Sequence, residues 1–534
     1  MGTKNLNSAT DLITFSRASG GTALRKISYG SELVTNGTFD NGTTGWTATA
    51  CSVSVVNGAM RITDTDGSIG YVDYRPTLEI GKAYLISAQV VTDNMSGNMI
   101  LNVGTSGGSG QMGTLAMPSV GTYSFTFTAT TSQPFVNLRN TSAGAGDYWD
   151  VDNISVKEVL YDQPDGTLQL FNSPDNTPRI EYNPDGTVKG LLIEEARTNL
   201  QPDNNSLEIK SVTNLTTTAN ATTAPDGTNT AVKLAINAGE TSSPRLLVGS
   251  GQNNPSNVSS IFAKAGEGSF NKIGLGAYNG GGYTAIAYFD LTTGTFDYIH
   301  RTSNRNISDY GIEPVGNGWY RIWIKPLNDS GTGFVFVVSD DSTSASSATA
   351  GNGSDGLYIW GHQVEAGAFP TSYIPTTGST ATRAADLASI PTANFGYNSD
   401  AGSIVAEVLH FTTESGAAAS GFAFDDGSAN NRMYYYQNKG QWIGSVSGST
   451  TFNIDTADPL ENSDTKVGTG YKKDNVSLVV NSSIIGNDTS TDIPSVNKFY
   501  FGSTSVGTYL NGHIKSIKYY PRRLSDTQLQ ELTT

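Results

Sequence analysis

Residues 178–200 read PRIEYNPDGTVKGLLIEEARTNL, and the rest of the chain is arranged around this stretch. Its first part alternates charged and apolar residues with a period of two, which indicates an exposed strand. The piece NPDG predicts a turn, because proline presets one turn dihedral and glycine accepts a positive one. We expect a packed joint, within the chain or against another subunit, with salt bridges and not an active site. The packed residues are expected to be Ile180, Leu191 and Ile193, and the ion-pairing residues Glu194, Glu195 and Arg197.

The composition indicates an all-β protein. Of the 534 residues, 60 are glycine and only 15% are charged, and few stretches have helical periodicity. Short strand-like runs alternate with Asn-Gly, Asp-Gly and Gly-Gly turns, which is typical of antiparallel sandwiches. We predict three jelly-roll-like β-sandwich domains in series, with a short N-terminal attachment unit.

The charge and the cysteine count exclude several classes of protein. A net charge of −16 and a pI near 4.7 argue against binding to nucleic acid or to an anionic membrane surface. Cys51 is the single cysteine, so no intrachain disulfide can form, and its alternating surroundings predict a buried strand position. The N-terminus lacks the apolar stretch of a signal peptide, and no run of about 18 apolar residues predicts membrane insertion.

Turn-rich and polar junctions divide the chain into five segments. The predicted segments are an attachment segment (1–29), an inserted jelly roll (30–158), a continuation of the attachment unit (159–200), a central β-sandwich (201–383) and a last β-sandwich (384–534).

Two pieces, ELVTNGTFDNGTTGW (32–46) and YWDVDNISV (148–156), open and close the inserted jelly roll. They resemble the carbohydrate-binding-module type of jelly roll found in glycan-degrading enzymes and in phage proteins. In that family these two strands lie close together, and some members bind a structural calcium there. Asp40 and Asp152 are the matching carboxylates. Because calcium takes six or more oxygens, two carboxylates do not establish a site, and no metal or other cofactor is predicted.

Three further pieces carry a second resemblance: ITFSRASGGTAL (13–24), TPRIEYNPDGTVKGLLIEEARTNL (177–200) and YIWGHQVEAGAFPTSYIPTTGSTATRAAD (358–386). Together they are similar to a module recurrent in bacteriophage virion fibre and spike proteins. In that family the first piece lies only a short distance before the second. The resemblance therefore implies that residues 30–158 are inserted into a composite N-terminal unit.

The chain ends in YLNGHIKSIKYYPRRLSDTQLQELTT (509–534), which predicts a strand followed by a short helix. Ser525 is an N-cap candidate and Gln528 completes a capping box, while Leu529 and Leu532 supply an apolar face. This ending resembles that of the laminin-G-like, concanavalin-type lectin sandwich.

The sequence has no catalytic motif. The four histidines are scattered and show no metal-ligand spacing. Adjacent carboxylates, such as Asp340 with Asp341, point to opposite faces of a strand, so they do not indicate a glycosidase pair. No repeat predicts the long β-helix of polysaccharide-cutting tailspikes. We therefore predict that the protein is not an enzyme.

Aromatic rings beside polar side chains are what a sugar-binding face needs. The jelly roll offers Tyr71 and others, and the last sandwich offers three consecutive tyrosines, Tyr434 to Tyr436. About half of such alternating positions belong to the core. The predicted glycan-binding residues are Trp46, Tyr74, Trp149, Asp425, Asp426, Asn431, Arg432, Tyr435 and Trp442.

Together these features predict a structural bacteriophage virion protein, a head or tail fibre or spike, that adheres to host surface glycans. Its expected partners are capsid, portal, neck or tail proteins, host polysaccharide and further copies of itself, most simply as a homotrimer, on the particle surface. Many copies would multiply weak single-site binding. Two alternatives stay open: a capsid decoration protein that binds no sugar, and a polysaccharide-degrading tailspike.

Overall fold

The computed structural model describes residues 13–534. The exceptions are positions 66, 95–96, 98, 141–143, 203–206, 208, 243, 250–254, 279–282, 302–306, 328–332, 342–348, 411–418 and 457–463. The chain forms two compact units. The inserted unit is Lys26–Thr167, and the main unit is Met1–Arg25 with Leu168–Thr534. The prediction of an all-β protein built from antiparallel sandwiches is confirmed.

The inserted unit is a sandwich of two sheets around one apolar core. The first sheet holds β10 (Gly121–Thr128), β7 (Ala83–Asn94), β12 (Tyr148–Tyr161) and β2 (Gly21–Glu32), with β5 (Ala59–Asp64) beside β12 and β4 (Cys51–Val56) beside β5. The second sheet has the order β3 (Thr47–Thr49), β6 (Tyr71–Tyr74), β11 (Phe135–Asn140), β8 (Met99–Gly104) and β9 (Gly113–Met117). The chain passes between the two units within β2 and at the start of β13 (Thr167–Ser173).

The central sandwich of the main unit also has two sheets with a shared core. One has the order β17 (Ile209–Thr213), β20 (Arg245–Val248), β27 (Gly333–Ser339), β22 (Lys272–Tyr278), β23 (Tyr283–Asp290) and β24 (Thr295–Arg301). The other has the order β18 (Leu215–Thr222), β19 (Ala231–Ile236), β28 (Gly356–Ala366), β21 (Asn257–Ala265), β26 (Trp319–Pro326) and β25 (Ile307–Gly316).

The C-terminal sandwich completes the main unit. One sheet has the order β1 (Thr14–Ser16), β30 (Leu387–Pro391), β39 (Lys498–Phe501), β32 (Ser420–Asp425), β33 (Arg432–Tyr436), β34 (Gln441–Val446) and β35 (Ser449–Asp455). The other has the order β14 (Ile180–Tyr182), β15 (Val188–Ile193), β40 (Gly512–Tyr520), β31 (Ala401–His410), β36 (Asp464–Lys472), β37 (Val476–Val480) and β38 (Ser483–Asp488).

The strands β1, β14 and β15 correct the predicted attachment unit. They do not form a module of their own, because β1 pairs with β30 and β15 pairs with β40. Ile193 is fully buried in the core of the C-terminal sandwich, and Leu191 packs against that core. The expected packing of the joint is therefore confirmed for these two residues, with the C-terminal sandwich as the partner.

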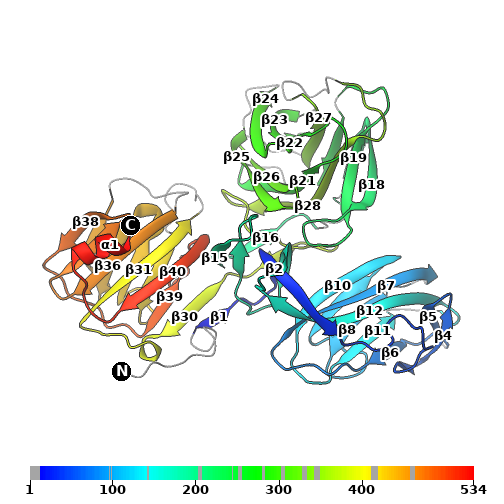
Figure 1. Cartoon of the computed structure of the whole chain (residues 1–534), viewed down its shortest axis with the longest axis horizontal. Helices are drawn as coiled ribbons and strands as arrows, with labels where there is room; N and C mark the ends of the chain where they lie inside the picture. Colours follow the sequence, from blue (N-terminus) through cyan, green and yellow to red (C-terminus); the bar gives the residue numbers. More distant parts are fainter. Residues whose placement is uncertain are drawn as a thin grey trace. The chain divides into compact units, whose positions relative to one another are not determined.

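The short helix α1 (Asp526–Leu532) lies over the sheet that contains β36 and β31 (Figure 1). Its predicted capping box is present: the backbone N–H of Gln528 donates to Ser525 Oγ at 3.2 Å, and the N–H of Ser525 donates to Gln528 Oε1 at 3.0 Å. Leu529 is fully buried, whereas Leu532 is 39% exposed. Of the two predicted leucines, only Leu529 therefore contributes to the buried apolar face.

A buried set of five charged side chains, which we call the arginine cluster, joins the three sequence pieces of the second resemblance. Arg17 Nη1 lies 3.1 Å from Asp386 Oδ1, and Arg179 Nη1 lies 2.8 Å from Glu194 Oε2. Arg179 also pairs with Asp386, and Arg383 Nη2 lies 3.5 Å from Glu194 Oε2. Each of these side chains is at most 2% exposed.

The joint's predicted salt bridges are confirmed. Glu194 pairs with two arginines of the cluster, and Arg197 Nε donates to Glu195 Oε1 at 2.6 Å. Here β16 (Arg197–Asn199) pairs with β29 (Ala381–Arg383), so the joint is tied to the segment that links the two sandwiches of the main unit.

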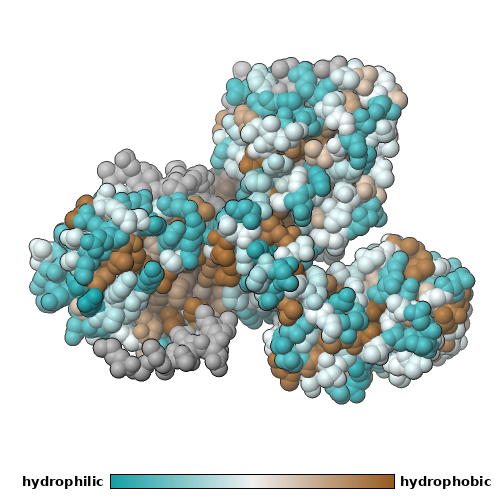
Figure 2. All heavy atoms as spheres, in the orientation of Figure 1, coloured by the Kyte–Doolittle hydropathy of each residue, from teal (hydrophilic) through white to brown (hydrophobic). Residues whose placement is uncertain are grey.

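On the face shown in Figure 2, hydrophilic side chains interrupt the apolar patches, as the polar composition implies. No helix among the described residues is long and apolar enough to cross a membrane.

Candidate functional site

The outer face of the second sheet of the inserted unit is unusually polar for the middle of a sheet. Strand side chains alternate between faces, so Val72, Leu101 and Leu138 enter the core and are fully buried there. Their sequence neighbours therefore point to the other face. On β6 and β11 these neighbours include Tyr71 and Arg139, which face each other across the strands.

One line of polar residues, which we call the polar row, crosses this face from edge to edge. Its members pair in register across all the strands of the sheet: Thr47, Asp73, Asn137, Asn102 and Thr114. Neighbouring strands lie about 4.8 Å apart, so the row is about 19 Å long. Asparagine and aspartate are disfavoured inside strands, so packing alone does not explain them here.

The loop 105–110 lies over the polar row. The N–H of Gly108 donates to Asn137 Oδ1 at 2.6 Å, and Asn137 Nδ2 donates to the carbonyl of Ser109 at 3.0 Å. The approach is close, because a Cβ at residue 107 would lie 2.9 Å from Asp73 Oδ2 and 3.1 Å from the Tyr71 ring. The loop therefore rests directly on the row and on the tyrosine beside it.

Among the described residues, three polar atoms beneath this loop are buried without a hydrogen-bond partner. They are Asp73 Oδ1, Asn102 Oδ1 and Arg139 Nε. Burial raises the pKa of Asp73 to about 6, against the opposing effects of the Gly108 N–H and of Arg75. Buried polar atoms in folded proteins are nearly always paired, so three unpaired atoms beneath one loop call for an explanation. Two acceptors, one donor and a tyrosine ring are groups that bind sugar hydroxyls and stack on a sugar ring.

The residues predicted for sugar binding in this unit face the core, which corrects the prediction. Trp46 and Trp149 are 7% and 3% exposed. Trp46 packs between Phe39 and Tyr74, with ring centroids 5.7 and 5.1 Å away. Tyr74 is partly buried against the same core, and its hydroxyl accepts from the N–H of Thr35. These rings fill the sandwich and offer no face to a ligand.

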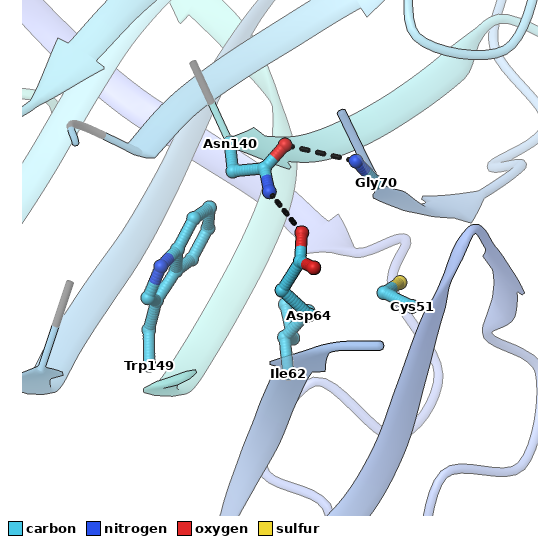
Figure 3. A pocket seen from close by; sticks show the side chains of 6 residues that line it. All are labelled: Cys51, Ile62, Asp64, Gly70, Asn140 and Trp149. Carbon is cyan, nitrogen blue, oxygen red and sulfur yellow. Dashed lines mark hydrogen bonds between the residues drawn. The ribbon is translucent and has the colours of Figure 1, made fainter. Parts of the chain in front are cut away.

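A very small pocket beside Trp149 shows how tightly that region is packed (Figure 3). Its volume is about 10 Å³, which is near the minimum for a single water molecule. Asn140 bridges it by donating to Asp64 Oδ2 at 3.1 Å and accepting from the N–H of Gly70 at 2.9 Å (Figure 3). Cys51 lines the pocket and is half-buried in β4, so the predicted burial is only partial. No sugar ring fits here.

In the C-terminal sandwich the predicted aromatic residues also lie inside. Tyr435 and Trp442 are fully buried and pack around Phe422 at 5.5 and 5.8 Å. Tyr434 and Tyr436 stand on the opposite, outer face, as strand alternation requires. The prediction therefore selected the wrong face of β33.

The four polar residues predicted beside them shape loops. Asp425 is fully buried and accepts from the N–H groups of Gly427 and Ser505. Asp426 accepts from Ser428 and Asn431, and these bonds lower its pKa. These carboxylates are thus committed to the backbone and to loop side chains.

The other two of the four also have internal contacts. Asn431 Oδ1 accepts from the N–H of Ser447 at 3.0 Å, and the Arg432 guanidinium lies 4.3 Å from the centre of the Tyr434 ring. The structure therefore does not bring the predicted residues of this sandwich together as one open site.

The calcium considered at the jelly-roll strands has no ligand set in the described residues. Asp40 Oδ2 accepts from the Thr38 hydroxyl at 2.7 Å, and Asp152 accepts from Asn153. No group of three or more acidic, histidine or cysteine side chains is placed to hold a metal ion in the part of the chain that is described.

The sequence contained a signal for the polar row that the prediction did not use. In FVNLRN (135–140), apolar residues alternate with Asn137 and Arg139, which marks a strand with one polar face. Tyr71 was among the aromatics considered but not among the residues selected. Only pairing with β6 and β8 places these side chains next to Asp73 and Asn102.

Comparison with known proteins gives distant structural likenesses only. No family model and no curated protein matches the chain. The chain is similar to the N-terminal CBM22 tandem domain of Paenibacillus barcinonensis Xyn10C, with a TM-score of 0.20 and 14% identity over 63% of this chain and 98% of that one. The LG1-3 region of the laminin α2 chain gives a TM-score of 0.15 and 9% identity over 86% of this chain and 97% of that one. At these TM-scores the two likenesses assign no role to the chain.

Sialidases are also among the similar structures. The alignment with Trypanosoma rangeli sialidase in complex with sialic acid covers 91% of this chain and 93% of that one, with a TM-score of 0.22 and 12% identity. The prediction that the protein is not an enzyme therefore does not stand. At this TM-score the likeness transfers no residue and no reaction to the chain.

Proposed function

We propose that the protein is an adhesion component of a bacteriophage particle and that it binds host surface glycans through the polar row of its inserted unit. The observation that carries the glycan part is the set of three buried polar atoms without partners, on a face that also presents Tyr71. Hydroxyl groups of a glycan would supply the missing partners. Because each strand spacing is close to the length of one sugar residue, a short linear glycan could follow the row across the sheet.

The particle role is supported by the three sequence pieces that resemble phage fibre modules. In the folded chain, each piece contributes at least one charged residue to the arginine cluster. These residues are Arg17 from the first piece, Arg179 and Glu194 from the second, and Arg383 and Asp386 from the third. These pieces are therefore the structural centre of the main unit. That arrangement is suited to holding modules in a fixed order on a particle.

A glycan array probed with the full chain tests the glycan part. We expect binding that falls by roughly tenfold or more in Tyr71→Ala and in Asn102→Ala, since each removes one recognition group. Ser52→Ala, at an exposed position of β4 on the other sheet, is the matched control. Absence of glycan binding by the folded wild-type chain would reject adhesion through sugars and favour a purely structural role. Electron microscopy of particles with antibodies against the chain tests the particle role separately.

A further inference from the structure

A second pocket lies in the main unit, where the pieces 13–24 and 358–386 meet. It has a volume of about 190 Å³ and is lined by residues that include Ser19, Asn172, Tyr373, Thr382 and Arg383. An apolar cavity of about 150 Å³ is enough to bind benzene, so this pocket has room for a six-membered ring or a small ion with its water.

The pocket adjoins the arginine cluster, because its lining residue Arg383 is a member of that cluster. The arginine cluster holds three guanidinium groups and two carboxylates, all nearly inaccessible to solvent. Beside it Glu195 is paired with Arg197. The Nε atoms of Arg179 and Arg383 are buried without partners. Burial, and to a lesser extent the neighbouring Arg179, lower the pKa of Arg17 to about 10, whereas Asp386 and Glu194 raise the pKa of Arg179.

An uncompensated buried charge is costly, and a nearby anion reduces that cost. Arg383 belongs both to the cluster and to the pocket lining. Asn172 and Thr382 bring an amide and a hydroxyl to the wall, and Tyr373 brings an aromatic ring. We propose that this pocket binds one small oxyanion, a carboxylate or a phosphate group, whose charge offsets the unmatched arginine. The proposal does not rest on glycan binding by the polar row.

Calorimetric titration of the full chain at constant ionic strength tests this proposal. The probes are glucuronate, inorganic phosphate and, as a neutral match, glucose. We expect saturable binding of glucuronate or phosphate and none of glucose. Tighter binding of glucuronate would identify the carboxylate of an acidic sugar as the source, and tighter binding of phosphate would identify a phosphate group. Absence of binding by both anions would overturn the proposal.

A charge placed in the pocket provides the sharper test. Thr382→Glu adds a carboxylate at the pocket wall, and Thr380→Glu adds the same charge to the same exposed segment outside the lining. We expect Thr382→Glu to weaken anion binding by roughly tenfold or more, as one like charge at short range does in a partly buried site, and Thr380→Glu to leave it unchanged. Asn172→Asp repeats the test with an isosteric change if Thr382→Glu does not fold. Equal affinity in the wall variant and its control would overturn the proposal.

Discussion

The arginine cluster and the polar row are both buried and polar, but they differ in whether their oxygens have partners. In the cluster, both oxygens of Glu194 and of Asp386 accept hydrogen bonds or pair with arginine. In the row, one oxygen of Asp73 accepts nothing. Buried carboxylates whose oxygens are all paired hold a structure together, whereas an unpaired carboxylate oxygen leaves free energy that a hydroxyl donor can recover. The difference separates a structural centre from a candidate binding face.

The largest effect is expected from breaking the cluster. Arg179→Leu would remove the arginine that pairs with both Glu194 and Asp386, so we expect the unfolding free energy of the C-terminal sandwich to fall by about 3–5 kcal/mol. Hydrogen exchange in β14, β15 and β40 measures the loss. Lys473→Ala, which removes the exposed partner of Asp492, is the control and should change nothing measurable. Unchanged exchange in Arg179→Leu would show that the cluster does not hold these strands.

The two regions should respond to pH with opposite signs. Burial would raise the pKa of Glu194, but Arg383 and Arg179 outweigh it and lower the pKa to about 2 from 4.5. Its contribution to stability is therefore present above pH 4.5 and is lost as the pH falls toward 2. Asp73 has a raised pKa of about 6 against 3.8, so its contribution is present below 3.8 and is lost as the pH rises through 6.

Hydrogen exchange across this pH range, corrected for the intrinsic rate, would show the contrast. We expect peptides from β6 and β11 to become more protected as the pH falls from 7 to about 4. Peptides from β15 should lose protection only below about pH 4.5. The same sign of change in both regions would contradict the distinction between them.

A smaller effect is expected when the titrating group of the row is neutralised. Asp73→Asn keeps the shape of the side chain and removes the charge that burial disfavours. At pH 7 we expect the inserted unit to be stabilised by about 1 kcal/mol, less than the full pKa shift would give because solvent screens the site. Thermal unfolding at pH 7 and pH 4 measures this, with the stabilisation present only at the higher pH. An equal stabilisation at both pH values would rule out the charge of Asp73 as the cause of the stabilisation.

The smallest effect concerns the loop over the row. Gly108 has a φ of +69°, so alanine would strain the closed loop and favour its opening. If a glycan must displace the loop, Gly108→Ala should raise affinity by roughly two- to fivefold. Gly58→Ala, at a φ of +86° with open space around it, applies similar strain elsewhere and should leave affinity unchanged. A weaker affinity in Gly108→Ala would mean that the closed loop takes part in binding.

The sequence predicted the type of candidate site but not the residues that form it. Tyrosines and amides in alternating strands indicated a sugar-binding face, yet most of the aromatics selected, such as Tyr435 and Trp442, belong to the core. A period of two assigns neighbours to opposite faces but does not say which face is covered. In β33 the inner residues could be recognised only once β33 and β34 had packed against the facing sheet.

The sequence by itself determined the all-β class, the turns, the cap of α1 and the pairing of Glu195 with Arg197, because these depend on residues close together in the chain. Only the tertiary structure decided that β1, β14 and β15 complete the C-terminal sandwich. It also decided that Arg17 meets Asp386 and that Asp73, Asn137 and Asn102 form one row. These contacts join residues far apart in sequence, and their partners are selected by packing of the whole chain, which no local pattern records.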